Sequence, residues 1–592
     1  MKQFFKMMFA SMIGVFISVG LLSFIWFMSI IAMVSSISSP SSSNAMLKSN
    51  EKVLKLSFNG DMKETTSNNP FEGLFSNTTT ISLNDVLAAI DAAKENDNIK
   101  GIYIDASNLS TGSANIDVIR RKLIDFKKDG KFVVAYADNY TQQCYYLASV
   151  ADKVFVNPLG KVLLTGFASQ TTFYKGILEK AGIEVVVFKV GTFKGAVEPF
   201  ILDKLSDANR AQITSYQSSI WGNIVGDIAS SRNIPESKIN DFADKGYMFA
   251  SAEKAIEYGL ADEVKYRDDA ENYIKELAGI GADEKFSTVG VTKMKNIKKR
   301  NIKLDSDQIA VVYAEGEILN SLLTPKIGSE NYITEKLVDE LIKLKKNDKV
   351  KAVVVRVSSP GGDAFLSEQI WKQIEDLKKE KKVVVSMGVV AASGGYYISC
   401  GADKIISEAN TLTGSIGVFG TFPNATGLFN KLSLTTDVVK TNKFADFGDY
   451  SRPMRDDEKA LMQSHVESIY DTFITRCSEG RGKTKEEIDN IGQGRVWTGE
   501  QALEIGLVDE LGGLDRAIEV AAELAGLTDY TVKTISSAKD PFSELFKSQI
   551  TEMKSSAIKE ALGEDYELMN VIRTIRNTSG IKARLPYDLE VL

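Results

Sequence analysis

A serine and a lysine, far apart in the sequence, have the types and surroundings needed for hydrolytic chemistry. Ser393 lies in the segment AASGGYY (391–397), and Lys194 lies in GTFKG (191–195). A lysine accepts a proton only when it is neutral, so its pKa must fall from about 10.4 towards 7–8 in an apolar pocket. Apolar residues on both sides of Lys194 can form that pocket: Val185, Val186, Val187, Phe188, Val197, Phe200 and Ile201. Because a single lysine is more often an ordinary surface residue, the assignment needs a second observation.

An internal repeat supplies that observation. Residues 97–194 align without a gap with residues 348–445, at a constant offset of 251 positions. At two places the alignment pairs a residue able to do chemistry with an inert one: Ser393 with Gln142, and Lys194 with Ala445. Each copy contains one half of a serine/lysine pair and lacks the other half. This pattern predicts a duplicated catalytic domain in which each copy supplies one of the two catalytic residues.

Three glycine-containing turns of the second copy follow predicted strands: VSSPGGD (357–363), AASGGYY (391–397) and TGSIGV (413–418). At the ends of neighbouring parallel strands, such turns line one crevice, where α/β proteins place their sites. Backbone N–H groups of Gly361 or Gly362 and of Gly394 can then form an oxyanion hole, in which each donor contributes about 3–4 kcal/mol. Ser415, in the third turn, is placed to hold the lysine amine in line. One such turn alone would indicate only a tight strand–helix connection.

The single histidine, His465, limits the other kinds of catalysis. Leu461, His465, Ile469 and Phe473 recur every four residues, which predicts that His465 lies on the apolar stripe of an amphipathic helix. One histidine cannot form an HExxH zinc site, and a Ser-His-Asp triad would depend on this residue alone. We therefore expect a structural role for His465.

Composition excludes several further classes of protein. The chain has 592 residues, of which 44% are hydrophobic and 25% are charged, and its net charge is −7. A nucleic-acid-binding protein would need a basic surface, so nucleic acid is not expected as a partner. Three cysteines, odd in number and far apart, provide no disulfide framework and are expected as buried small residues: Cys144, Cys400 and Cys477. No metal or cofactor is expected.

The N-terminus predicts a membrane anchor. Residues 7–34 contain no charged residue, and about 20 helical residues suffice to cross a bilayer. A cleaved signal peptide is the alternative, but its apolar core is usually about 7–15 residues long. Lys2 and Lys6 precede the span, so the positive-inside rule leaves the first residues in the cytoplasm and exports the rest. We expect a single-pass protein of the inner (cytoplasmic) membrane, with the catalytic body on the periplasmic or extracytoplasmic side and the lipid bilayer as a partner.

The body shows apolar strands alternating with amphipathic helices. In the first copy the expected strands and helices cover residues 53–60, 83–95, 101–104, 116–128 and 132–135. In the second copy they cover residues 309–316, 333–346, 352–357, 366–379 and 383–386. Alternation of this kind predicts parallel βαβ units. The fold class is therefore α/β, with two related domains in tandem.

The sequence divides into seven segments. We expect a cytoplasmic N-terminus (1–6), the anchor (7–34), a Ser-rich tether (35–50), the first repeat (51–263), a linker (264–307), the second repeat (308–527) and a helical C-terminal extension (528–592). The linker contains a basic run that we interpret as solvated, with contact to anionic lipid as the alternative: Lys293, Lys295, Lys298, Lys299, Arg300 and Lys303. The extension offers no chemistry that the sequence reveals.

Taken together, these motifs resemble one family. The anchor, the tandem repeat, the SxPGG turn, ASGGYY, TGSIGV and FKGAVEPF (193–200) are similar to the long, duplicated form of bacterial signal peptide peptidase A, or protease IV. The resemblance implies a ClpP/crotonase-like fold and a bowl-shaped homotetramer on the outer face of the cytoplasmic membrane that degrades signal peptides left after preprotein processing. It also implies Ser393 as nucleophile, Lys194 as general base and Ser415 as the hydroxyl that orients the lysine.

Two other functions remain open at this stage. A crotonase-type acyl-CoA enzyme would share the fold and the oxyanion hole but would not use a serine nucleophile. A non-catalytic membrane scaffold would require that both copies have decayed, although Ser393 keeps its two following glycines. The membrane anchor and the serine/lysine division favour a peptidase. The resemblance implies that it acts on signal peptides and other unfolded peptides.

Overall fold

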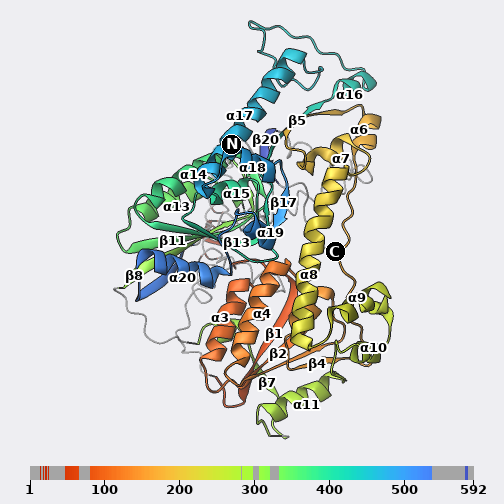
Figure 1. Cartoon of the computed structure of the whole chain (residues 1–592), viewed down its shortest axis with the longest axis vertical. Helices are drawn as coiled ribbons and strands as arrows, with labels where there is room; N and C mark the ends of the chain where they lie inside the picture. Colours follow the sequence, from red (N-terminus) through yellow and green to blue (C-terminus); the bar gives the residue numbers. More distant parts are fainter. Residues whose placement is uncertain are drawn as a thin grey trace, which may run out of the picture.

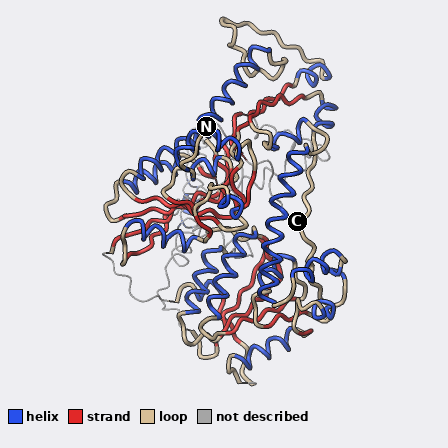
Figure 2. The backbone as a smooth tube through the Cα atoms, viewed as in Figure 1, coloured by secondary structure: helices blue, strands red, loops and turns tan. Residues whose placement is uncertain are grey.

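The computed structural model describes residues 47–65, 81–281, 283–297, 306–320, 332–535 and 580–584, together with scattered positions between 14 and 28. In Figure 1 the first repeat, mostly orange, lies below the second repeat, in green and blue. Figure 2 shows that each repeat has strands at its centre and helices around them. This is the α/β architecture that the alternation of apolar strands and amphipathic helices predicts.

The sheet of the first repeat is parallel and covered on both faces. Its strand order is β6-β4-β3-β2-β1-β7. The strands are β1 (Glu51–Asp61), β2 (Gly101–Ser110), β3 (Phe132–Ala137), β4 (Lys153–Val156), β6 (Glu263–Val264) and β7 (Ser287–Gly290). Alternate residues of β3 pack on opposite sides: Val133 and Ala135 join the core that contains α3 (Leu83–Lys94) and α4 (Ser113–Lys127), whereas Val134 and Tyr136 pack with α11 (Arg267–Leu277).

The sheet of the second repeat contains the same strand order, β18-β14-β13-β11-β8-β19. These strands are β8 (Asp307–Glu315), β11 (Val350–Ser359), β13 (Lys382–Ala392), β14 (Lys404–Ser407), β18 (Glu510–Leu511) and β19 (Tyr530–Ile535). The same sheet branches at the end of β13, where β15 (Leu412–Gly414) pairs with β13 and β17 (Val496–Thr498) pairs with β15. One face carries α13 (Lys336–Lys345) and α14 (Ala364–Lys378), and the other carries α20 (Leu514–Ala525). Equivalent tyrosines make equivalent bonds, since Tyr145 donates to the Leu260 carbonyl at 2.8 Å and Tyr396 to the Leu507 carbonyl at 2.9 Å. The predicted duplication is confirmed at the level of the fold.

Two expectations about the connecting segments need correction. Part of the expected linker folds into the first repeat as α11, β7 and α12 (Val291–Met294), where Lys293 pairs with Glu51 and Lys295 with Asp85, each at 2.5 Å. The basic run is expected to be solvated because sequence alone does not show the carboxylate partners of these two lysines. Lys298 to Lys303 lie outside the described residues. Of the C-terminal extension, which is expected to be helical, the described parts are the strands β19 and β20 (Gly580–Arg584), and residues 536–579 and 585–592 lie outside the described residues.

A third, mixed sheet joins the two repeats. Its order is β10-β9-β12-β20-β16-β5. The strands are β5 (Glu184–Val190), β9 (Glu317–Ile318), β10 (Tyr332–Ile333), β12 (Gly361–Asp363), β16 (Val418–Asn424) and β20. β5 belongs to the first repeat and pairs antiparallel with β16 of the second along its whole length. In Figure 1 the long helix α8 (Asp207–Arg232), in yellow, then runs back from this region to the first repeat.

Charged and polar bonds hold the two repeats against each other. Arg356 of β11 bonds Glu64 at 2.9 Å, and both side chains are at most 3% exposed. Arg121 of α4 makes two bonds of 2.6 Å to the buried carboxylate of Glu408. Removing one partner of the buried Arg356–Glu64 pair leaves an uncompensated charge, which typically costs about 3–5 kcal/mol. The interface therefore specifies how the two copies dock.

The predicted membrane span lies almost wholly outside the described residues. Among the residues that are described, no helix is long and apolar enough to cross a membrane.

The helix that carries the histidine has its apolar stripe one residue away from the predicted position. In α17 (Asp456–Arg481) the buried residues are Glu458, Met462, Val466, Tyr470, Phe473, Ile474 and Cys477. His465 and Leu461 are exposed, so the prediction that His465 lies on the apolar stripe is wrong. The three cysteines are free and buried, as expected.

Candidate active site

Lys194, Ser393 and Ser415 meet in the interior, between the two repeats. The Lys194 Nζ donates to the Ser393 Oγ at 2.8 Å, although the two residues are 199 positions apart in the sequence. The same Nζ donates to the Ser415 Oγ at 3.0 Å and to the Ser415 carbonyl at 3.1 Å. All three residues are 0% exposed. The structure thus brings together the three side chains that the sequence singled out.

Ser393 occupies a strained turn between β13 and α15 (Gly394–Ser399). Its φ is 54° and its ψ is −113°, a combination that residues with a side chain rarely adopt. The Ser393 N–H donates to the Gly414 carbonyl at 2.8 Å, which ties this turn to the end of β15 (Leu412–Gly414). A sharp strand-to-helix turn of this type presents a nucleophilic hydroxyl away from the backbone.

Lys194 follows β5 and precedes the short helix η1 (Gly195–Val197). The second repeat holds this segment through its backbone, because the Phe193 N–H donates to the Gln493 carbonyl at 2.8 Å. Gln212 of α8 adds a bridge: its Nε2 donates to the Phe193 carbonyl at 2.8 Å, and its Oε1 accepts from the Val496 N–H at 3.1 Å. No sequence pattern points to Gln212 or Gln493, because these contacts form only when the two repeats dock.

Two glycines leave room for the lysine. A Cβ on Gly417 would lie 3.2 Å from the Lys194 Cδ, and a Cβ on Gly494 would lie 2.7 Å from the Lys194 backbone nitrogen. Gly494 also has a φ of +77°, which disfavours any other residue. The loop containing Gly494 therefore packs directly against the lysine, and a side chain there would displace it.

Burial holds the pKa of Lys194 well below its usual range. The cause is desolvation, because the charged ammonium loses its water without gaining a carboxylate partner from the groups bonded to it. The three contacts of the amine are to two hydroxyls and one carbonyl, which are compatible with a neutral amine. The site therefore favours the protonation state in which the lysine can accept a proton.

Ser415 is held by its own strained backbone. Its φ is 50°, and its N–H donates to the Arg495 carbonyl at 2.7 Å. Because this bond fixes the turn, both oxygens of Ser415 face the amine of Lys194. The residue is thus placed to limit the directions in which the amine can point.

The candidate oxyanion glycines lie in two adjacent turns. A Cβ on Gly361 would lie 2.7 Å from the Gly394 nitrogen, so these two backbones are in contact. Gly361 has a φ of +99° and Gly362 of +153°, conformations that other residues rarely adopt. In the structure the Gly361 N–H donates to the Ser359 Oγ at 3.1 Å. The turn and Gly394 together form a backbone cradle beside Ser393.

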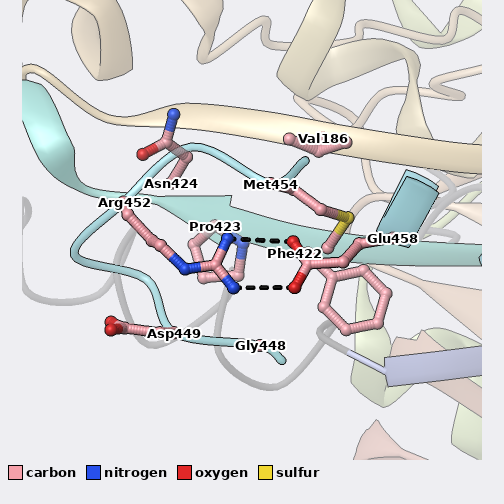
Figure 3. A pocket seen from close by; sticks show the side chains of 9 residues that line it. All are labelled: Val186, Phe422, Pro423, Asn424, Gly448, Asp449, Arg452, Met454 and Glu458. Carbon is pink, nitrogen blue, oxygen red and sulfur yellow. Dashed lines mark hydrogen bonds and ion pairs between the residues drawn. The ribbon is translucent and has the colours of Figure 1, made fainter. Parts of the chain in front are cut away.

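A separate hollow on the third sheet lacks this chemistry. It lies between β16, β5 and the start of α17, and its lining includes Val186, Phe422 and Met454 (Figure 3). An ion pair between Arg452 and Glu458, with contacts of 2.7 and 2.9 Å, lies across it. The serine, the lysine and the glycine turns do not line it.

Comparison with known families agrees with this geometry. The model of peptidase family S49 matches the chain twice, at residues 125–281 and 375–528. The Clp protease model matches residues 314–413. The chain belongs to peptidase family S49. It is a serine protease with a ClpP-like α/β fold in each of two repeats, so the acyl-CoA enzyme and the scaffold are set aside.

Individual relatives cover most of the chain. Protease 4 of Haemophilus influenzae is 36% identical over 75% of this chain and 73% of its own length. The chloroplastic serine protease SPPA of Arabidopsis thaliana is 31% identical over 85% of this chain and 73% of its own length. Among solved structures, a ClpP1 mutant from Listeria monocytogenes aligns with 35% of this chain and 94% of its own, at 16% identity and a TM-score of 0.24. The predicted membership of the signal peptide peptidase A family is confirmed by the two sequence relatives.

Proposed function

We propose that this S49 protease is a membrane-anchored endopeptidase that uses a Ser393/Lys194 dyad to degrade cleaved signal peptides. The observation that carries the proposal is the 2.8 Å contact between the Lys194 Nζ and the Ser393 Oγ inside a fully buried site. Family membership supports the choice of a serine nucleophile. The burial of the lysine supports its role as the base, because a solvated lysine would be protonated at neutral pH.

The proposed reaction begins with a neutral Lys194. With the amine uncharged, the 2.8 Å contact runs in the opposite sense, and the Ser393 hydroxyl donates to Nζ. As the oxygen attacks the peptide carbonyl, the lysine takes its proton and then passes it to the departing amine. The N–H of Gly394 binds the oxyanion together with a second N–H, either that of Gly362 or that of Gly361 after it leaves the Ser359 Oγ. Water then hydrolyses the acyl-enzyme by the same route.

Ser415 acts as a positioning residue in this scheme. A protonated Lys194 has three N–H bonds. The hydroxyl and the carbonyl of Ser415 accept two of them, so the third points to Ser393. This is the orienting role that a third group plays in other activated nucleophiles.

The N-terminus and the choice of substrate complete the proposal. The uncharged residues 7–34 form a single-pass anchor, residues 35–50 a tether, and residues 51–263 and 308–527 the two catalytic repeats outside the cytoplasm. An enzyme anchored there meets signal peptides where they are released into the bilayer. A buried site admits an extended peptide but not a folded protein, which suits a scavenger of such fragments.

The repeat also suggests how chains assemble into the proposed homotetramer. The offset of 251 relates β5 to residues 435–441 of the second copy, and β16 to residues 167–173 of the first. Neither segment is a strand in the described chain, although β5 and β16 pair with each other. Strand pairing between residues 435–441 of one chain and residues 167–173 of the next would repeat the contact that β5 and β16 make within the chain. Repeated from chain to chain, this contact would close a ring. Val439, in the first of these segments, is 99% exposed.

One substitution tests the assembly without touching the dyad. Val439→Pro removes a backbone donor and should break the new strand pairing, so light scattering should show a smaller assembly. Val439→Thr keeps the donor and should leave the mass unchanged. If Val439→Pro assembles as the wild type does, this ring contact is wrong.

The function itself is tested with the full chain in lipid vesicles and a synthetic signal peptide. We expect internal cleavage of the peptide by the wild type and none by Ser393→Ala. Cleavage of folded proteins at a comparable rate, or equal cleavage by Ser393→Ala, would contradict the proposal.

A further inference from the structure

A chain of hydrogen bonds links the second repeat to the helices α4 and α8, which lie below it in Figure 1. Asp117 of α4 is 8% exposed, and its two carboxyl oxygens have different partners. The Asn410 Nδ2 of the second repeat donates to the Asp117 Oδ2 at 2.9 Å, and the Tyr146 hydroxyl lies 2.6 Å from the Asp117 Oδ1. The same hydroxyl also contacts the Oδ2 of Asp227, on α8. Asn223 of α8 completes the chain, because its Nδ2 donates to the Asn410 Oδ1 at 3.0 Å.

The middle of this chain needs one proton more than ionised carboxylates provide. The Tyr146 hydroxyl has a single hydrogen, yet it lies between two carboxyl groups. If both carboxyls were ionised, the hydroxyl could donate to only one of them, and the other would face a lone pair of the same oxygen. With a proton on Asp117, each contact has one donor and one acceptor, since Asp117 donates to Tyr146 and Tyr146 donates to Asp227. The geometry therefore binds a proton.

Burial decides which of the two carboxyl groups carries that proton. The side chain of Asp227 is 51% exposed and its Oδ2 lies 3.8 Å from the Arg120 Nε, so its negative charge is solvated and lies beside a cation. Burial raises the pKa of Asp117 to about 7, and the charges of Glu408 and Asp227 act in the same direction. The charged and titratable groups around this carboxyl and the tyrosine hydroxyl come from α4, from the neighbouring helices and from the second repeat: Arg120, Arg121, Tyr146, Asp227 and Glu408.

The second repeat contains the same arrangement without the extra proton. At the offset of 251, Glu368 corresponds to Asp117, and a tyrosine again donates to it, from Tyr397 at 2.7 Å. The 26-residue helices α8 and α17 align end to end, which puts Arg476 where the first repeat has Asp227. Arg476 pairs with Glu368 at 2.8 Å, so an arginine balances this carboxylate. In the first repeat a carboxylate stands in place of the arginine, and a proton must supply the missing positive charge.

Asn410 connects the proton to the candidate active site. It lies in the loop between β14 and β15, five positions before Ser415, which faces the amine of the catalytic lysine. The first repeat holds this loop at a second point as well, where Arg121 bonds Glu408. Loss of the proton leaves an ionised Asp117 near the carboxylate of Glu408, and two like charges at a buried junction repel each other. The loop that leads to Ser415 is then held less firmly against α4.

We propose that Asp117 is a positioning residue that holds a proton at the junction of the two repeats, and that loss of this proton loosens the loop leading to Ser415. The inference rests on the proposed function only where it concerns hydrolysis, because the hydrogen bonds that bind the proton do not involve the dyad. With the loop closed, Asp117 has a pKa of about 7, whereas with the loop open its pKa returns towards about 3.9. Between these values the closed form binds one proton more than the open form. Rising pH therefore favours opening, by up to about tenfold per pH unit, and the effect levels off above about pH 7.

Hydrogen–deuterium exchange of the full chain tests the inference, with mass spectrometry at about pH 6 and about pH 8.5 and correction for the intrinsic effect of pH on exchange. In the wild type, peptides covering residues 408–415 should lose protection by about tenfold between the two conditions. Asp117→Asn keeps a neutral group at every pH and should show no such loss. Asp227→Asn should show none either, because Tyr146 can then donate to an ionised Asp117. Glu368→Gln changes the equivalent carboxylate of the second repeat and should behave as the wild type does.

Peptide hydrolysis on the same samples tests the positioning role. The ratio of the wild-type kcat to that of Asp117→Asn should fall as the pH rises over this range. Titration of Lys194 occurs in both proteins, so its effect cancels in the ratio. A constant ratio, with a loop that still loses protection, would overturn the positioning role.

The other failures can be told apart. Equal protection of residues 408–415 at the two pH values in the wild type would overturn the inference and leave the proposed function standing. A wild-type loss of protection in Asp117→Asn or in Asp227→Asn would also overturn it. A wild type that shows the loss but hydrolyses no peptide would contradict the proposed function and leave the proton at Asp117 in place.

Discussion

The two copies of the repeat differ in backbone conformation where Gln142 of the first aligns with Ser393 of the second. In the first copy Gln142 begins α5 (Gln142–Ala148) behind an ordinary N-cap, Thr141, whose φ is −66° and ψ 161°. The Gln142 Oε1 accepts from the N–H groups of Thr165 and Gly166 at 3.0 and 2.9 Å. In the second copy Ser393 holds a φ of 54° in place of that regular cap. Strain of this kind costs about 1–3 kcal/mol and persists where a nucleophile must be presented.

The lysine position shows the reverse difference. Lys194 is fully buried, and the segment around it is bonded to the second repeat. Ala445, its counterpart, is exposed, and the neighbouring Phe444 is 40% exposed. One segment of the same origin thus completes a site, whereas the other faces solvent. In the proposed mechanism, the two repeats together therefore form one active site, to which each contributes one residue of the dyad.

The largest effect should come from removing either half of the dyad. Ser393→Ala and Lys194→Ala should each lower kcat by about 10³-fold or more, because the nucleophile and its base act as a unit. Gln142→Ala changes the equivalent position of the first copy and should leave kcat within about twofold, as should His465→Ala. Steady-state hydrolysis of a peptide measures all four variants. If Lys194→Ala turns over near the wild-type rate, the lysine is not the base.

Mixing the two inactive variants tests whether the site is formed within one chain. The contact between Lys194 and Ser393 is internal to the chain, so co-expressed Ser393→Ala and Lys194→Ala chains should regain no activity. Mass analysis must show that mixed assemblies formed. Substantial recovery of hydrolysis in them would show that each dyad is shared between chains.

A smaller effect is expected at the positioning residue. Ser415→Ala removes one acceptor from the Lys194 amine but keeps the carbonyl contact, so kcat should fall by about 10²-fold. The pH profile should move as well, and Ser415→Thr should restore part of the rate because it keeps the hydroxyl. A loss in Ser415→Ala with an unchanged profile and no rescue by threonine would indicate a purely structural role.

The smallest effect concerns stability. Burial lowers the folded-state pKa of Lys194, so between that value and about 10.4 the folded chain binds one proton fewer than the unfolded chain. The unfolding free energy of the wild type should therefore rise with pH relative to Lys194→Met, by up to about 1.4 kcal/mol per pH unit in this window. Denaturant titrations at several pH values measure the difference. A constant or falling difference would mean that the lysine remains charged in the folded state.

The sequence predicted the repeated core because its signals are local. Apolar runs such as those of β3 and β11 are buried on both faces, and their spacing from the helices is the same in each copy. The pairing of Ser393 with Lys194 could also be predicted from the sequence. In the repeat, Ser393 aligns with Gln142 and Lys194 with Ala445, so each copy lacks the residue that the other contains. Both inferences use only residue type and position along the chain.

The remaining features depend on contacts between distant segments. Gln212 and Gln493 act only across the docked repeats, and β20 joins a sheet whose other strands end far earlier in the sequence. The error at His465 has a local cause: positions four apart advance by about 40° around a helix at each step. Over Leu461, His465, Ile469 and Phe473 this rotation is large, so Phe473 is buried whereas Leu461 is exposed.

The pH dependence of the reaction of Ser393 with a covalent serine-directed probe tests the central claim most directly. If Lys194 is the base, labelling of the wild type should increase with pH through an apparent pKa well below that of free lysine, and Lys194→Ala should label far more slowly at every pH. Mass spectrometry of the labelled peptide identifies the modified residue. A rate that stays flat between about pH 6 and 9, or equal labelling of Lys194→Ala, would contradict a serine/lysine dyad built from the two repeats.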